Sequence, residues 1–137
     1  KKEDQVMENE TLLAVETALC ENLQAPLRIF NKRILFDLKR NPIFEIDGII
    51  ICGDTVFLIE SKHNMSKKHI ESLNKRLNEF PEKLQIAIQA DPEFLELSGK
   101  FYAGVVCGAK FPEELRGLSM HKGLIVVYPG GDRYKVE

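Results

Sequence analysis

The sequence contains few cysteines and gives no sign of covalent cross-links or of a bound zinc ion. Its 137 residues include only three cysteines, Cys20, Cys52 and Cys107, and no two of them form a CxxC pair. An odd number of cysteines in apolar surroundings argues against both a disulfide framework and a zinc knuckle. We therefore expect reduced, buried thiols in an intracellular protein of the nucleus or the cytoplasm.

Long apolar runs, a strong net charge and a phosphate-binding loop are also absent. No run approaches the roughly 20 apolar residues that cross a bilayer, so we expect no membrane partner. The net charge is −2, so a nucleic-acid partner would be held by a local patch rather than by the charge of the whole molecule. The turn at residues 129–132 is not followed by the Gly-Lys-Ser or Gly-Lys-Thr tripeptide of a P-loop.

The composition is that of an ordinary globular domain. Hydrophobic residues make up 44% of the chain and charged residues 29%, with no internal repeat or low-complexity tract. A chain of this length can bury one hydrophobic core, so we predict a single domain over residues 1–137. Because the first residue is Lys rather than Met, we expect this domain to be cut from a longer protein.

The spacing of apolar residues predicts an alternation of helices and strands. One helix is predicted over residues 3–22, a second after the N-cap Ser66 with an interruption at Pro81, and a short third from Pro112. Strands are predicted over residues 27–38 (one strand, or two around a turn), 43–52, 55–62, 101–107, 124–128 and 133–136. Residues 82–97 should form a helix followed by an irregular segment. We predict an α/β fold with a mixed central sheet and helices on both faces.

Two of the most apolar predicted strands carry charged residues. Residues 43–52 contain Glu45 and Asp47, and residues 55–62 contain Glu60 and Lys62. An unpaired charge in a buried strand costs several kcal/mol, so these residues require an explanation. Because side chains alternate along a strand, both acids of the first strand share one face, and Glu60 and Lys62 share one face of the second.

A tight turn at residues 53–54 would place two of these acids opposite each other. Such a turn pairs Cys52 with Thr55, and counting back along both strands then pairs Asp47 with Glu60. Opposed residues have Cβ atoms about 5 Å apart. Two carboxylates at that distance repel each other unless they share a proton or a cation. A hard divalent cation with oxygen ligands, Mg²⁺ or Mn²⁺, would remove the conflict.

An alternative explains the same residues without a functional site. Glu60 and Lys62 would form an ion pair at a sheet edge, and Asp47 would cap a turn through the following Gly48. This alternative requires three acids and a lysine to converge by accident at the ends of the two most apolar strands. We therefore favour a metal site.

The residues Glu45-Ile46-Asp47-Gly48 and Glu60-Ser61-Lys62 resemble the motif of the PD-(D/E)xK, or restriction-endonuclease-like, nuclease superfamily. The α-β-β-β-α-β core of that superfamily has the order predicted here, and the resemblance covers roughly residues 8–127. Asp47, Glu60 and Lys62 match the motif, whereas Ile46 stands where the motif has proline. The string EIDG…VFLIESKH also resembles nuclease-like domains at the C-termini of fungal and oomycete proteins, including Crinkler-type effectors.

This resemblance implies a metal-dependent nuclease that hydrolyses phosphodiester bonds, preferably in DNA. Asp47 and Glu60, helped by the backbone carbonyl of Ser61, would bind Mg²⁺ or Mn²⁺, and Lys62 would position the attacking water. Glu45 is a candidate further ligand. An acid from the first helix often completes such sites, which makes Glu16, or otherwise Glu10, a candidate unless both lie on a solvated helix face. The expected catalytic set is therefore Asp47, Glu60, Lys62, Glu45 and Glu16.

Basic residues after the motif are candidates for nucleic-acid contact: His63, Lys67, Lys68 and His69. Lys67 and Lys68 begin a predicted helix, where cations oppose the helix dipole, and contact with a phosphate backbone would offset that cost. A solvated helix face is the alternative. The expected partner is nucleic acid, preferably DNA, and a dimer is one option for the oligomeric state.

Two other functions compete with a nuclease. One is a catalytically inactive nuclease-fold domain that binds nucleic acid or acts as an effector module. The other is an assembly module that docks a helicase, an NTPase or another protein, with the carboxylates as structural remnants.

Overall fold

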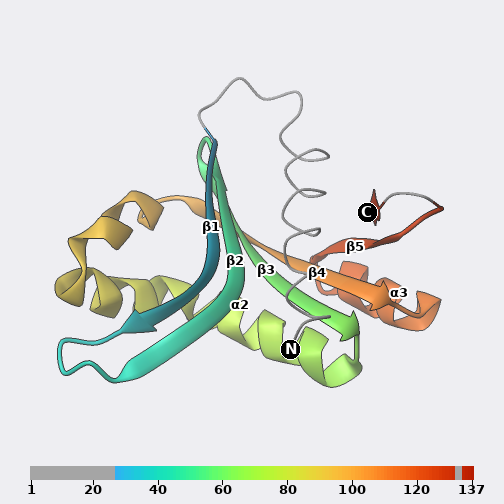
Figure 1. The fold of residues 1–137 in the computed structure, drawn as a ribbon, viewed down its shortest axis with the longest axis horizontal. Coiled ribbons are helices and arrows are strands. Elements are labelled where there is room, and N and C mark those ends of the chain that lie inside the picture. The colour runs from blue at the N-terminus through green and yellow to red at the C-terminus, as the bar shows by residue number, and fades with distance from the viewer. Residues whose placement is uncertain (1–26, 132–133) are drawn as a thin grey trace.

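The computed structural model describes residues 27–131 and 134–137, which form a mixed β-sheet with helices packed against it (Figure 1). The helix expected over residues 3–22, with Glu10, Glu16 and Cys20, lies outside the described residues. In the part of the chain that the structure describes, no helix combines the length and the apolar character needed to cross a membrane.

The described elements follow one another in the predicted order. They are β1 (Leu27–Phe36), β2 (Pro42–Cys52), β3 (Thr55–Asn64), α2 (Lys67–Ala90), the 3₁₀-helix η1 (Pro92–Leu97), β4 (Phe101–Lys110), α3 (Glu113–His121), β5 (Ile125–Pro129) and β6 (Tyr134–Val136). The predicted boundaries differ from these by a few residues, as is usual for element ends. Of the two options left open for residues 27–38, a single strand is correct.

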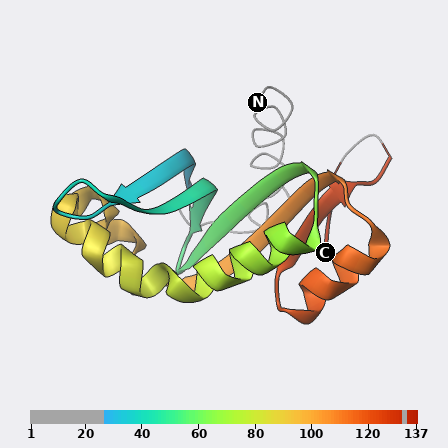
Figure 2. The same ribbon diagram turned by 90° about the horizontal axis from the view of Figure 1, so that it is seen from below.

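The six strands lie in the sheet in their sequence order, β1-β2-β3-β4-β5-β6. β1, β2 and β3 are antiparallel, β3, β4 and β5 are parallel, and β6 is antiparallel to β5. The two parallel connections run in the same direction along the sheet, so crossovers of the same hand place their helices on the same face. Figure 2 shows α2 and α3 along one side of the sheet.

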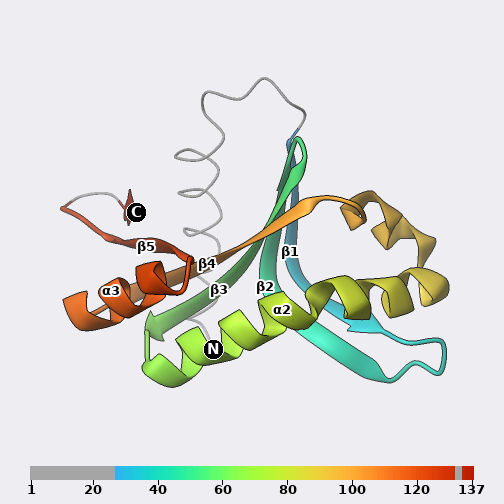
Figure 3. The same ribbon diagram turned by 180° about the vertical axis from the view of Figure 1, so that it is seen from behind.

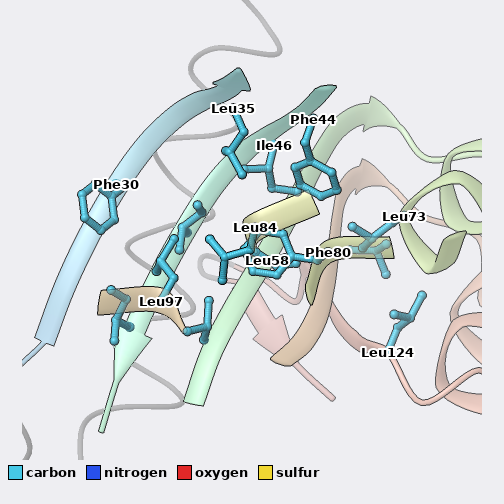
Figure 4. Close-up of a cluster of buried hydrophobic side chains, with 14 of the residues drawn as sticks. Phe30, Leu35, Phe44, Ile46, Leu58, Leu73, Phe80, Leu84, Leu97 and Leu124 are labelled. Atoms are coloured by element: carbon cyan, nitrogen blue, oxygen red, sulfur yellow. The ribbon is translucent and has the colours of Figure 1, made fainter. Parts of the chain in front are cut away.

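Two groups of buried apolar side chains lie on the two faces of the sheet. The larger group joins residues of β2 and β3, such as Leu58, to Leu73, Phe80 and Leu84 of α2 (Figure 4). The second group, on the opposite face, includes Ile50, Cys52, Phe57, Ile59, Val105, Cys107 and Val127. The described helices pack on the first face. Helices were predicted on both faces, and the helix predicted over residues 3–22 lies outside the described residues. Cys52 and Cys107 are buried free thiols, as predicted.

α2 begins where the sequence predicts but continues past its proline. Ser66 caps the helix by accepting a hydrogen bond from the backbone N–H of His69, and the helix then runs to Ala90. The prediction that Pro81 interrupts it is wrong. A proline inside a helix costs about 3 kcal/mol. Phe80 and Leu84, on either side of Pro81, are fully buried, and burying two such side chains contributes about 1.5–3 kcal/mol each.

The β1–β2 hairpin leaves the rest of the sheet halfway along β2. β2 pairs with β3 only from Cys52 to Gly48, whereas β1 stays paired with β2 almost to its tip. The outer half of the hairpin lies against the C-terminal half of α2 (Figure 3). There the ring centroids of Phe44 and Phe80 are 5.2 Å apart. Asp47 of β2 and Glu60 of β3 lie at the point where the two strands separate.

Candidate active site

Asp47 and Glu60 meet where β2 separates from β3. The predicted pairing of Cys52 with Thr55 is confirmed, and the register continues to Gly48 opposite Ile59. Asp47 and Glu60 occupy the next position on each strand, and their carboxyl groups are close enough to share a hydrogen bond. The two residues are only 9% and 7% exposed. Counting residues back from the turn at residues 53–54 therefore correctly predicted that these two carboxyl groups lie side by side.

Each of the two carboxyl groups also accepts a hydrogen bond from a donor group of another residue. Asp47 Oδ2 accepts a hydrogen bond of 3.0 Å from the backbone N–H of Ser61. Glu60 Oε2 accepts one from Nη2 of Arg76, which lies on α2. Nη1 of the same guanidinium donates to the backbone carbonyl of Glu45 over 2.7 Å. Side chains thus supply the hydrogen bonds that a continued β2–β3 ladder would supply in an ordinary hairpin.

The electrostatic environment keeps the two carboxyl groups from being ionised together. Burial, followed by the hydrogen bond and the negative charge of Asp47, raises the pKa of Glu60 to about 8, although Arg76 acts to lower it. Near neutral pH the metal-free pair therefore retains a proton. A divalent cation could replace that proton, because it compensates both charges at once.

The two acids lie in a cleft of about 820 Å³ between the hairpin and α2. Lys62 lines the same cleft, as expected from its position two residues beyond Glu60 on the same face of β3. The hairpin wall consists of Lys32, Ile34, Pro42, Ile43, Phe44 and Glu45, and the helix wall of His69, Ser72, Arg76, Glu79 and Lys83. The structure thus gathers the three motif residues in one concave site.

Comparison with known proteins gives the family of the chain. A family model described as "NERD: Nuclease-related domain" matches residues 7–92, which is more than half of the sequence. The chain belongs to the nuclease-related domain family. This family match supports the predicted resemblance to nucleases of the PD-(D/E)xK type, and the mixed sheet with packed helices confirms the predicted α/β class. The narrower resemblance to Crinkler-type effectors stays a prediction.

No curated protein matches this nuclease-related domain at the significance required. A solved structure described as an EndoMS-dsDNA2 complex matches with a TM-score of 0.49 and 12% sequence identity. The match covers 89% of this chain and 44% of that chain, so the domain spans less than half the length of that protein.

Four other residues predicted for the site of the nuclease-related domain lie either in the wall of the cleft or in the first turn of α2. Glu45 lines the cleft, and its exposed carboxylate pairs with Lys32 Nζ at 2.9 Å. His69 also lines the cleft, and its Nδ1 lies 2.8 Å from Ser66 Oγ. Lys67 and Lys68 are exposed in the first turn of α2.

Of the predicted residues that the structure describes, four are not among those that line the cleft: Ser61, His63, Lys67 and Lys68. His63 is half-buried on β3 and is not among the residues that line the cleft. Ser61 is buried, and its backbone N–H donates a hydrogen bond to Asp47. Glu16 lies outside the described residues.

Arg76 is the site residue whose contact the sequence did not predict. The predicted site did not include Arg76, whereas the structure pairs it with Glu60. A usable signal was present, because His69, Arg76 and Lys83 are spaced by seven residues and so lie on one face of a helix. That face lines the cleft, and Lys83 Nζ donates to the backbone carbonyl of Ile43 over 2.9 Å.

The donor groups of this site suit a hard divalent cation. Among residues 27–131 and 134–137, no three His, Cys, Asp or Glu side chains are grouped so as to hold a metal ion. The described site therefore offers two carboxyl groups and backbone carbonyls. Mg²⁺ is commonly held by one or two carboxylates and completes its coordination with water and substrate phosphate. Asp47 and Glu60 fit that requirement.

Proposed function

We propose that this nuclease-related domain hydrolyses phosphodiester bonds in DNA with the help of Mg²⁺ or Mn²⁺. The observation that carries the proposal is the pair of buried carboxyl groups, Asp47 and Glu60, that meet in a cleft beside Lys62. Membership of the nuclease-related domain family supports nuclease chemistry. DNA is the substrate implied by the resemblance of the motif to PD-(D/E)xK nucleases.

Asp47, Glu60 and the backbone carbonyl of Ser61 are the groups proposed to hold the cation. The N–H and C=O of one strand residue point to the same edge of the strand. Since the N–H of Ser61 bonds Asp47, its carbonyl faces the same edge, where β2 has separated from β3. When bound, the cation would polarise the scissile phosphate and lower the pKa of a coordinated water.

Lys62 is proposed to orient the attacking water and to offset negative charge on the phosphate. Its side chain extends from β3 on the same face as Glu60 and lines the cleft. An ammonium group aimed at developing negative charge is most effective in a site that largely excludes water. Glu45 lies nearer the cleft rim, bound to Lys32, so we propose that it assists through water rather than as a direct ligand.

The nucleic acid is proposed to contact the first turn of α2. Lys67 and Lys68 are exposed there and His69 lines the cleft. Cations in the first turn of a helix oppose the helix dipole, and a phosphate backbone nearby would compensate for that arrangement.

Cleavage assays with matched variants test the proposal. Wild type, Asp47→Asn and Lys62→Met are incubated with plasmid DNA, single-stranded DNA or RNA in Mg²⁺, in Mn²⁺ or in EDTA. We expect cleavage of DNA by the wild type with either cation, none in EDTA, and losses of at least about 100-fold in both variants. Glu71→Gln, an exposed carboxylate of α2, is the control and should cut as the wild type does.

Each unexpected result of the cleavage assay would contradict a different part of the proposal. A folded wild-type protein that leaves every nucleic acid intact would contradict nuclease activity. Binding of DNA that is equal in the wild type and Asp47→Asn, without cleavage, would favour the inactive binding or effector domain. Cleavage of RNA alone would change the substrate but retain the reaction.

A further inference from the structure

We propose that Arg76 is a positioning residue for the nuclease reaction, which fixes the separation of β2 and β3 around Asp47 and Glu60 and orients Glu60 for the cation. The inference rests on the proposed function. It concerns a residue on α2, outside the motif formed by β2 and β3.

The guanidinium of Arg76 joins three elements of the site. Its Nη2 bonds the carboxyl group of Glu60 on β3, and its Nη1 donates to the backbone carbonyl of Glu45 on β2 over 2.7 Å. Nε lies 3.4 Å from the carbonyl of Ser72, one turn earlier in α2. The side chains of Arg76 and Glu60 are only 21% and 9% exposed. One planar group therefore connects both strands of the site to the helix.

The position of Arg76 coincides with the end of the β2–β3 ladder. After Gly48 opposite Ile59 the two strands no longer exchange backbone hydrogen bonds. The backbone carbonyl of Glu45 has no ladder partner on β3 and accepts its hydrogen bond from Arg76 instead. The Arg76 side chain therefore takes the place of a backbone hydrogen bond between β2 and β3. Because this side chain is longer than a direct backbone hydrogen bond, its length determines how far apart the two strands lie beside Asp47 and Glu60.

Lys83 provides a comparison within the same cleft. Its Nζ donates to the carbonyl of Ile43, two residues before Glu45 on β2, so it also attaches the hairpin to α2. In the described hydrogen bonds and ion pairs, however, Lys83 contacts no carboxyl group of the site. The two residues share the structural task of holding the hairpin, and only Arg76 also binds Glu60.

An arginine is needed for this double contact. A guanidinium carries five N–H donors at fixed angles and can bond two acceptors in its plane, whereas a lysine ammonium is a compact group on a flexible stem. With Oε2 bound to Arg76, Glu60 would bind the cation through Oε1. Groups that orient metal ligands typically contribute about 10–100-fold to metal affinity or activity.

The experiment compares Arg76→Lys and Arg76→Met with Lys83→Met in the whole chain. Melting midpoints without metal measure the structural contribution, Mn²⁺ titrations measure cation affinity, and initial rates at saturating Mn²⁺ give kcat and KM for DNA. We expect both Arg76 variants to lose about 10–100-fold in Mn²⁺ affinity and in kcat with little change in KM. Lys83→Met should lower the melting midpoint and keep kcat and Mn²⁺ affinity close to the wild-type values.

Chemical rescue provides a readout that a purely structural role would not give. Millimolar guanidinium should restore part of the kcat of Arg76→Ala, and the same concentration of ammonium should not. The inference is overturned if Arg76→Lys keeps the wild-type kcat and Mn²⁺ affinity, or if the losses in the Arg76 variants parallel those of Lys83→Met at equal loss of stability. A wild-type protein that neither binds Mn²⁺ nor cuts DNA overturns the proposed function itself, and the two failures are therefore distinct.

Discussion

The carboxyl group of Glu60 is buried next to that of Asp47, and both are held by donors from other elements. Burial disfavours the charged form of Glu60 and the neighbouring acid adds to the effect, while Arg76 opposes them. Such an arrangement is unfavourable when both groups are ionised, and a bound cation would relieve it. It also makes the stability of the metal-free protein depend on pH.

We predict that Glu60→Gln becomes more stable relative to the wild type as the pH rises from 5 to 9 in EDTA. The raised pKa of Glu60, about 8, lies above its value in the unfolded chain, so between the two values the folded state binds more protons. Stability contributed by this group is therefore present at low pH and is lost as the pH rises through about 8. Denaturant melts should show a differential change of a few kcal/mol, since each pKa unit corresponds to about 1.4 kcal/mol.

Glu45→Gln is the matched control for that measurement. It removes a carboxylate from the same cleft, but one that is exposed and paired with Lys32. A pH dependence that is the same in the wild type, Glu60→Gln and Glu45→Gln would contradict the burial argument.

α2 carries two adjacent stripes of residues with different tasks. Ile70, Leu73, Phe80, Leu84 and Ala87 are buried against the sheet, and the neighbouring stripe that includes His69, Arg76 and Lys83 lines the cleft. The helix thus anchors the core and supplies one wall of the site. A small displacement of α2 from the sheet would alter both.

Gly104 of β4 allows α2 and the sheet to approach closely. A Cβ atom at this position would lie 2.7 Å from Leu124 Cδ2 and 3.2 Å from Leu77 Cδ2. We predict that Gly104→Ala destabilises the protein by about 1–3 kcal/mol, because extra atoms in a packed core force neighbours to move. Chemical denaturation would measure this change.

Gly117 in α3 is the matched control with the opposite expected sign. A Cβ atom there meets nothing within 4 Å, and alanine is preferred over glycine inside a helix by about 0.5–1 kcal/mol. Gly117→Ala should therefore stabilise the protein slightly. Destabilisation by both substitutions would show that the contacts at Gly104 are not the cause.

For the domain as a whole, cation binding should be coupled to folding. The proposed ligands come from β2 and β3, and the unfolded chain does not bring them together. We predict that Mn²⁺ raises the melting midpoint of the wild type. A concentration 100-fold above Kd adds about 2.7 kcal/mol, which corresponds to several degrees for a domain of this size.

Asp47→Asn identifies the site responsible for that increase. Without one of the two carboxylates the variant should show little or no rise in melting midpoint with Mn²⁺. An equal rise in the wild type and the variant would mean that the cation binds elsewhere, and the proposed ligands would then be wrong.

The sequence alone determined the local features of this domain. The strands, the cap at Ser66 and the register that brings Asp47 to Glu60 were all predicted, because alternation and turn length act over a few neighbouring residues. Lys62 in the same cleft followed from its spacing to Glu60. The motif resemblance also predicted a nuclease family, although not the nuclease-related domain family by name, because the motif depends on residues of two neighbouring strands.

The tertiary structure decided the features that depend on distant segments. Pro81 stays inside α2 because its neighbours Phe80 and Leu84 are buried against the sheet, which local propensity does not include. The separation of β2 from β3, and the contact between Arg76 and the Glu45 carbonyl 31 residues away, arise only when the hairpin packs on the helix. Hydrogen bonds that replace a broken ladder come from wherever the fold supplies a donor, and no local pattern specifies that partner.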